Sequence, residues 1–197
     1  IFLAGRSLPK LERVARLIVD EGGTVDYDEV DALDEFSVER HADQVADAAG
    51  GIDISVNAVG IAHFSGTPFA KLSFAEYSQP IDAYSRTHFV TARAAACHMV
   101  PRRSGAILMC KPGSRLSDAG VTGIGAASAA VEALARALAG ELGPEGIRVA
   151  CLQPGAISAT FPSRLSTLAE IGSFAVMMAC DQAGAMTDAF ADLAWAA

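Results

Sequence analysis

Residues 147–155 read Ile-Arg-Val-Ala-Cys-Leu-Gln-Pro-Gly, and this stretch decides the fold class. The run Ile147–Leu152 is mostly apolar and stops at Pro154-Gly155, as a buried strand does when it ends in a turn. An Ala-rich segment, Gly120–Leu142, precedes it and has the length and composition of a long helix. A helix that leads directly into a buried strand is the repeating unit of a parallel α/β sheet.

The same alternation extends outward to both ends of the chain. Short apolar runs predict further strands at Ile1–Ala4, Ile52–Ala58, Gly105–Cys110 and, more weakly, Phe190–Trp195. Thr24–Val30 is also expected to be a strand, but its alternating acidic residues predict that it is poorly buried. Helical spacing predicts helices at Leu8–Glu21, from Ser37 to Ala49, from Pro80 to just before Pro101, and at Leu168–Ala179, with a helical turn at Ser73–Tyr77. We find no repeat or linker, so residues 1–197 are expected to form one domain.

Composition excludes several classes of function. Hydrophobic residues make up 51% of the 197 residues and charged residues 19%, which is typical of a folded α/β protein. The net charge of −8 argues against a nucleic-acid partner, and no apolar run approaches the roughly 18 residues that span a bilayer. The four cysteines and four histidines show no metal-ligand spacing. We therefore expect a cytoplasmic protein without a metal site.

Six motifs stand at or near expected strand ends. They are Ala4-Gly5-Arg6-Ser7, Asp31-Ala32-Leu33-Asp34, Asn57-Ala58-Val59-Gly60, Glu141-Leu142-Gly143 with Gly146-Ile147-Arg148-Val149, Pro154-Gly155-Ala156-Ile157 and Ala185-Met186-Thr187. In this order they resemble the short-chain dehydrogenase/reductase family along essentially the whole chain. The resemblance implies a Rossmann-type, doubly wound parallel sheet in three layers, α/β/α, and an NAD(P)-dependent oxidoreductase ancestry.

The resemblance also implies a cofactor site. Arg6 would stand where a 2′-phosphate falls, which favours NADP over NAD, and Asp31 would accept from the adenine amine. Both residues have plainer alternatives, a solvated arginine and a turn former. The residues expected to contact the cofactor are Arg6, Ser7, Asp31, Ala32, Asn57, Ala58, Gly60, Pro154, Gly155 and Ile157.

The family's glycine-rich turn, which places a pyrophosphate at a helix N-terminus, has no counterpart in this sequence. In this fold it follows a first strand that lies between the strands at Ile1–Ala4 and Ile52–Ala58. We expect these two strands to have unpaired edges. We also expect the absent strand and helix to come from a part of the protein outside residues 1–197 or from another chain.

The positions of the family's proton-transfer residues are all altered. In the family a tyrosine donates the proton and a lysine four residues later lowers its pKa, with a serine and an asparagine nearby. Registered on the helix at 129–134, these positions fall on Ile124, Ser128, Pro112 and Tyr84. No tyrosine or lysine occurs from residue 113 to residue 152, so a shifted register cannot restore the pair.

Three functions follow from this pattern. The first is a catalytically degenerate cofactor-binding or partner subunit, a homodimer or homotetramer formed through the two long helices. The second is an active NADP-dependent enzyme for a small carbonyl or alcohol, with relocated residues such as Tyr84, Lys111 and, after a two-residue slip, Ser114. His88, one turn beyond Tyr84, could share that site. The third is a non-functional product.

Overall fold

The computed structural model describes residues 1–61, 66–112, 120–153, 168–180 and 189–192. The strands are β1 (Phe2–Gly5), β2 (Asp26–Glu29), β3 (Ile54–Asn57), β4 (Gly105–Cys110), β5 (Ile147–Gln153) and β6 (Ala189–Asp192). The α-helices are α1 (Leu8–Asp20), α2 (Glu35–Ala49), α3 (Phe74–Met99), α4 (Thr122–Leu142) and α5 (Leu168–Ala179). Three short 3-10 helices are η1 (Phe69–Lys71), η2 (Val100–Arg102) and η3 (Gly143–Glu145).

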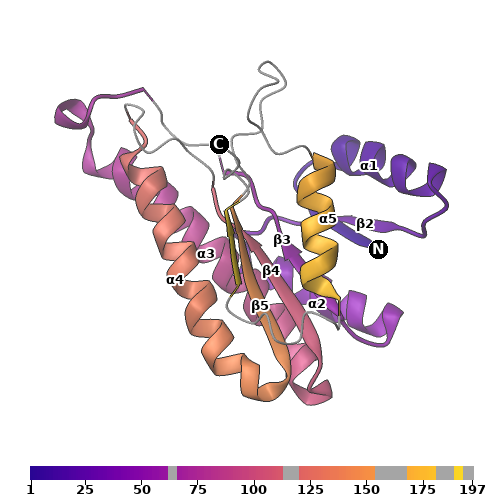
Figure 1. Cartoon of the computed structure of the whole chain (residues 1–197). Coiled ribbons are helices and arrows are strands. Elements are labelled where there is room, and N and C mark those ends of the chain that lie inside the picture. The colour runs from indigo at the N-terminus through magenta and orange to yellow at the C-terminus, as the bar shows by residue number, and fades with distance from the viewer. Residues whose placement is uncertain (62–65, 113–119, 154–167, 181–188, 193–197) are drawn as a thin grey trace.

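All paired strands run parallel, which confirms the predicted α/β class. Four of them form one sheet in the order β3-β4-β5-β6, and β1 pairs only with β2. In Figure 1, α3 and α4 lie on one side of the four-stranded sheet and α5 lies on the other. The described elements thus have the three-layer arrangement expected of a Rossmann-type fold.

The core of the four-stranded sheet follows the alternation of side chains along β4. Ile107 and Met109 are fully buried, and they belong to the apolar cluster that α3 and α4 build over one face. Leu108 points to the other face and packs with Met178 of α5. Gly123 lets α4 approach α3, because a Cβ there would lie 2.6 Å from the Tyr77 carbonyl oxygen. Both faces of the sheet are therefore covered at β4.

The sheet is split between β1 and β3. Figure 1 shows the β1–β2 pair beyond β3, on the side away from β4, and the two sheets share no strand. Ile54 and Val56 of β3 are 49% and 53% exposed, although strands of a Rossmann sheet are normally buried on both faces. Within the described residues, the edges of β1 and β3 at this split have no paired strand, as the sequence led us to expect.

Two helix starts differ from prediction. The prediction that the long helix begins at Pro80 is wrong, since α3 begins at Phe74 and carries Pro80 inside it. Ser73 and Glu76 form a capping box that satisfies the first turn and fixes the earlier start. Helix α2 starts at Glu35 after an extended Asp34, two residues before the Ser37 that was expected to cap it.

Candidate functional site

The described cofactor candidates lie at the carboxyl ends of β1, β2 and β3. Arg6 and Ser7 follow β1, Asp31 and Ala32 follow β2, and Asn57 ends β3, with Ala58 and Gly60 directly after it. Ligands of open parallel sheets bind beyond this end of the strands. The other predicted residues, Pro154, Gly155, Ile157 and Ser114, lie outside the described residues.

The polar candidates differ in what they contact. Arg6 is exposed, and Ser7 is the N-cap residue of α1 without a side-chain cap bond. Asp31 Oδ1 accepts a hydrogen bond from the Leu33 amide at 3.0 Å, so one carboxylate oxygen serves a local turn. A Cβ added at Gly60 would meet no atom within 4 Å, which leaves open space beside this backbone.

Asn57 points into the protein at the end of β3. Its side chain is only 5% exposed, and its Oδ1 accepts from the Ser55 hydroxyl at 3.3 Å. The Nδ2 atom is buried and has no hydrogen-bond partner. A buried donor without a partner costs on the order of 1–3 kcal/mol, so a hydrogen-bond acceptor placed next to Nδ2 would be stabilising.

The positions predicted to replace the family's tyrosine and asparagine lie together in the core. Ile124 of α4 is 2% exposed and Tyr84 of α3 is 5% exposed, and both belong to the cluster under α3 and α4. The Tyr84 hydroxyl oxygen accepts a weak hydrogen bond from the Ile61 amide at 3.4 Å. The two side chains therefore fill apolar space beside the end of the sheet.

Lys111 immediately follows β4 and forms an ion pair that sequence reasoning did not anticipate. Its Nζ donates to Glu132 Oε2 of α4 at 2.6 Å, and the lysine side chain is only 11% exposed. Arg136 adds a second cation at 3.2 Å from Glu132. The hydrogen bond from Lys111 is the main cause of a lowered pKa at Glu132. Glu132 lies one helical turn beyond Ser128, so the pair occupies the same α4 face as Ile124 and Ser128, the positions predicted to correspond to the family's tyrosine and lysine.

Sequence comparison places this arrangement in a family. The family profile described as enoyl-(acyl carrier protein) reductase, of the short-chain dehydrogenase type, matches residues 1–192. The chain is 32% identical to (2S)-[(R)-hydroxy(phenyl)methyl]succinyl-CoA dehydrogenase subunit BbsD of Thauera aromatica, over 74% of this chain and 68% of that protein. It belongs to the short-chain dehydrogenase/reductase family.

Other proteins similar to this family member are also dehydrogenases, reductases or synthases by their names. Zerumbone synthase of Zingiber zerumbet is 34% identical over 71% of this chain and 51% of its own length. The 3-oxoacyl-[acyl-carrier-protein] reductase FabG of Chlamydia pneumoniae is 30% identical over 74% of this chain and 58% of its own. The citronellol catabolism dehydrogenase AtuB of Pseudomonas aeruginosa has a structure with a TM-score of 0.81 at 25% identity, covering 96% of this chain and 80% of that one. The chain spans from about half to two thirds of these curated relatives' length.

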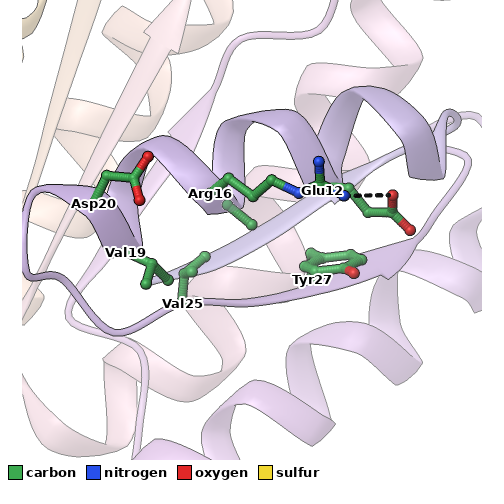
Figure 2. A pocket seen from close by; sticks show the side chains of 7 residues that line it. Glu12, Arg16, Val19, Asp20, Val25 and Tyr27 are labelled. Carbon is green, nitrogen blue, oxygen red and sulfur yellow. Dashed lines mark ion pairs between the residues drawn. The ribbon is translucent and has the colours of Figure 1, made fainter.

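One groove on the described surface of this short-chain dehydrogenase/reductase chain lies away from the strand-end positions. A groove of about 390 Å³ lies between α1 and β2 and includes the Glu12–Arg16 ion pair and Tyr27 (Figure 2). It contains none of the predicted site residues. Within the described ranges, no group of three His, Cys, Asp or Glu residues could hold a metal ion, and no helix is long and apolar enough to cross a membrane.

Two further residues were missed or undervalued by sequence reasoning. Glu132 could have been found from its four-residue spacing after Ser128, which sets it on the same face of α4. His88 was noted only as a neighbour of Tyr84, whereas its side chain is fully buried between α3 and the end of β4. Such burial depends on contacts between distant segments and carries no local signal.

Proposed function

We propose that this chain is a catalytically degenerate member of the short-chain dehydrogenase/reductase family that binds NADP and does not perform the family's proton transfer. The observation that carries the proposal is Ile124, which stands at the position assigned to the tyrosine and is buried in apolar core. An isoleucine has no proton to donate to an alkoxide and none to exchange with an alcohol.

The surrounding substitutions support the same proposal. Ser128, at the lysine position, carries no charge that could lower the pKa of a neighbouring acid. Pro112, at the serine position, has neither a hydroxyl nor an amide proton. Every group that would polarise a substrate carbonyl in the family's arrangement is therefore replaced by one that cannot.

The contacts of Tyr84 and Lys111 argue against a relocated catalytic pair. The Lys111 ammonium is neutralised by Glu132 at 2.6 Å, and Tyr84 is packed in the core with its hydroxyl against the Ile61 amide. A proton donor needs hydrogen-bond reach to substrate. Neither group offers its polar end to a ligand in this arrangement.

The strand ends fit the adenosine part of NAD(P), the cofactor type of this family. The exposed Arg6 guanidinium would hold a 2′-phosphate, which favours NADP. The second Asp31 oxygen would accept from adenine, and the open space at Gly60 admits a ribose. When bound, this cofactor supplies a hydride, whereas the chain's own residues supply binding and orientation.

The proposed function includes a homodimer or homotetramer and a small carbonyl or alcohol ligand. The outer face of α4 supports self-association, because Ala129, Ala133 and Ala137 are exposed at four-residue spacing and would let another helix approach closely.

Calorimetry with NADPH and NADH, combined with a cofactor-oxidation assay over a panel of small carbonyls, tests the proposal. We expect NADPH to bind more tightly than NADH and neither to be oxidised. Arg6→Ala should weaken NADPH binding and leave NADH binding nearly unchanged, whereas the matched variant Arg16→Ala, on an exposed helix face, should change neither. Turnover by the unmodified chain would overturn the degenerate assignment; absence of binding to both cofactors would overturn the cofactor assignment.

A further inference from the structure

Of the three histidines that lie in the described part of the chain, His41, His88 and His98, only His88 has no exposed surface. Its side chain has a relative exposure of 0%, whereas His98, on the same helix, has a side chain that is 26% exposed. His98 pairs with Asp43 of α2 at 3.0 Å, and His41 pairs with Asp28 of β2 at 2.9 Å. The two partly exposed histidines thus have carboxylates to balance a positive charge.

His88 faces carbonyl oxygens instead. Its Nδ1 lies 3.0 Å from the Tyr84 carbonyl oxygen, one turn earlier in α3, and its Nε2 lies 3.2 Å from the Cys110 carbonyl oxygen of β4. A neutral imidazole has one N–H donor, so it can donate to only one of these two acceptors. One of the two carbonyl oxygens therefore receives no hydrogen bond from a neutral His88.

The single proton of neutral His88 is best placed on Nε2. The Tyr84 carbonyl already accepts from the Thr87 hydroxyl at 3.2 Å. The β3–β4 register ends at the pair Asn57↔Met109, so the Cys110 carbonyl lies one residue beyond the last paired position. With its proton on Nε2, His88 of α3 donates a hydrogen bond to the Cys110 carbonyl oxygen, directly before Lys111 at the end of β4.

Among the described residues, no carboxylate contacts the His88 ring to balance the charge of a second proton. The described contacts of the ring are the two carbonyls and the Thr87 hydroxyl. The nearby titratable groups are the Tyr84 phenol on α3, whose ring centroid is 6.1 Å away, and Cys110 and Lys111 at the end of β4. On α4, Glu132 is engaged by Lys111 and Arg136. The two carbonyls could each accept a hydrogen bond from a doubly protonated ring, but neither carries the negative charge that would offset a fully buried cation.

We propose that His88 is an acid-sensitive latch, in which the neutral imidazole joins α3 to the end of β4 and a second proton releases this strand end. Burial lowers the pKa of His88 below its ordinary value of 6.5, and the two carbonyls oppose that effect only in part. As the pH falls, His88 therefore takes up its second proton more readily when the end of β4 is detached from α3 than when it is closed. The stabilisation is fully present above pH 6.5 and is lost as the pH falls from there toward the lower pKa of the closed form.

The test compares the unmodified chain with His88→Gln and with the matched control His98→Gln, at about pH 8 and about pH 5.5. Hydrogen-exchange protection factors for residues 105–112 measure the opening of the strand end. Urea unfolding midpoints measure the stability of the whole fold. In the unmodified chain the opening constant should rise by up to about tenfold per pH unit, because one proton is taken up on opening. His88→Gln should flatten that dependence, and His98→Gln should retain it.

Side-chain NMR of the unmodified chain keeps the proposal testable if His88→Gln does not fold. We expect the His88 signals to show a neutral imidazole protonated on Nε2 throughout the pH range in which the chain stays folded. A His88 ring that titrates near pH 6.5 in the folded chain would overturn the latch. An equal pH dependence in His88→Gln and the unmodified chain would overturn it as well.

Discussion

The four-stranded sheet and the β1–β2 pair are both built from short parallel strands, yet they differ in composition and in how they are covered. In the four-stranded sheet, α3 and α4 cover one face and fully bury Ile107 and Met109, while α5 lies on the other. In the β1–β2 half, Phe2 is 37% exposed and α1 leaves Leu17 61% exposed. Two causes separate the regions: β4 is apolar and covered by helices, whereas β2 reads Asp-Tyr-Asp-Glu and its partner β1 lacks a second paired edge in the described structure.

The two regions are joined mainly through α2. Val30, directly after β2, packs with Val38 and Ala42 of α2 and with Val90 and Ala94 of α3. This small cluster holds β2 to the main body without any strand pairing between β1 and β3. The gap between the two sheets is thus bridged by helices.

The largest expected effect uses two isoleucines of neighbouring strands. Ile107→Ala in β4 should lower the free energy of unfolding by about 2–5 kcal/mol, because it leaves a cavity at a site with no exposed surface. Ile54→Ala in β3 should change it by no more than about 0.5 kcal/mol, since that side chain is 49% exposed. Urea unfolding of the two variants measures both values. A large loss for Ile54→Ala would mean that the β3 edge is covered in the protein.

The next effect concerns the ion pair that ties the end of β4 to α4. Lys111→Met should cost about 1–2 kcal/mol, because it leaves the partly buried Glu132 with the more exposed Arg136 as its remaining charged donor. The double variant Lys111→Met with Glu132→Leu should recover most of that loss. The pKa of Glu132 is lowered by the Lys111 hydrogen bond, so the pair's contribution should be present above pH 4.5 and disappear as the pH falls below it. If the double variant is no more stable than Lys111→Met, the pair does not act as a unit.

The smallest effect concerns the polar tether between the two regions. Arg93 of α3 pairs with both Glu35 and Glu39 of α2, and all three side chains are partly exposed. Arg93→Ala should cost at most about 1 kcal/mol, and the cost should shrink further in high salt. Thermal unfolding at low and high ionic strength measures it. A cost of several kcal/mol that persists in high salt would show that the tether is more than a surface contact.

The covered region was predictable from sequence, and the exceptions have physical causes. The run Ile147–Leu152 and the Ala-rich helix before it carry local signals strong enough to locate β5 and α4. The split between β1 and β3 was predictable because the family's fold assigns the place between them to another strand. The start of α3 was not predicted correctly, because the capping box at Ser73 outweighs the helix-start signal of Pro80.

The site was predictable only in part. Strand-end positions such as Arg6 and Asp31 follow from motif order, and the structure places them at strand ends. The Lys111–Glu132 pair joins residues 21 positions apart, and the burial of His88 depends on β4, 22 residues away. Such pairings arise from tertiary packing, so no local sequence pattern predicts them.

Single-turnover hydride transfer tests the central claim most directly. The purified protein is mixed with NADPH and an excess of each carbonyl of the panel, and the absorbance of the reduced cofactor is followed. Because we propose that Ile124 and Ser128 occupy the positions of the family's tyrosine and lysine, we predict no loss of reduced cofactor beyond that of a sample without protein. Oxidation of NADPH above that background, abolished by Tyr84→Phe or Lys111→Met, would contradict the account and establish a relocated catalytic site.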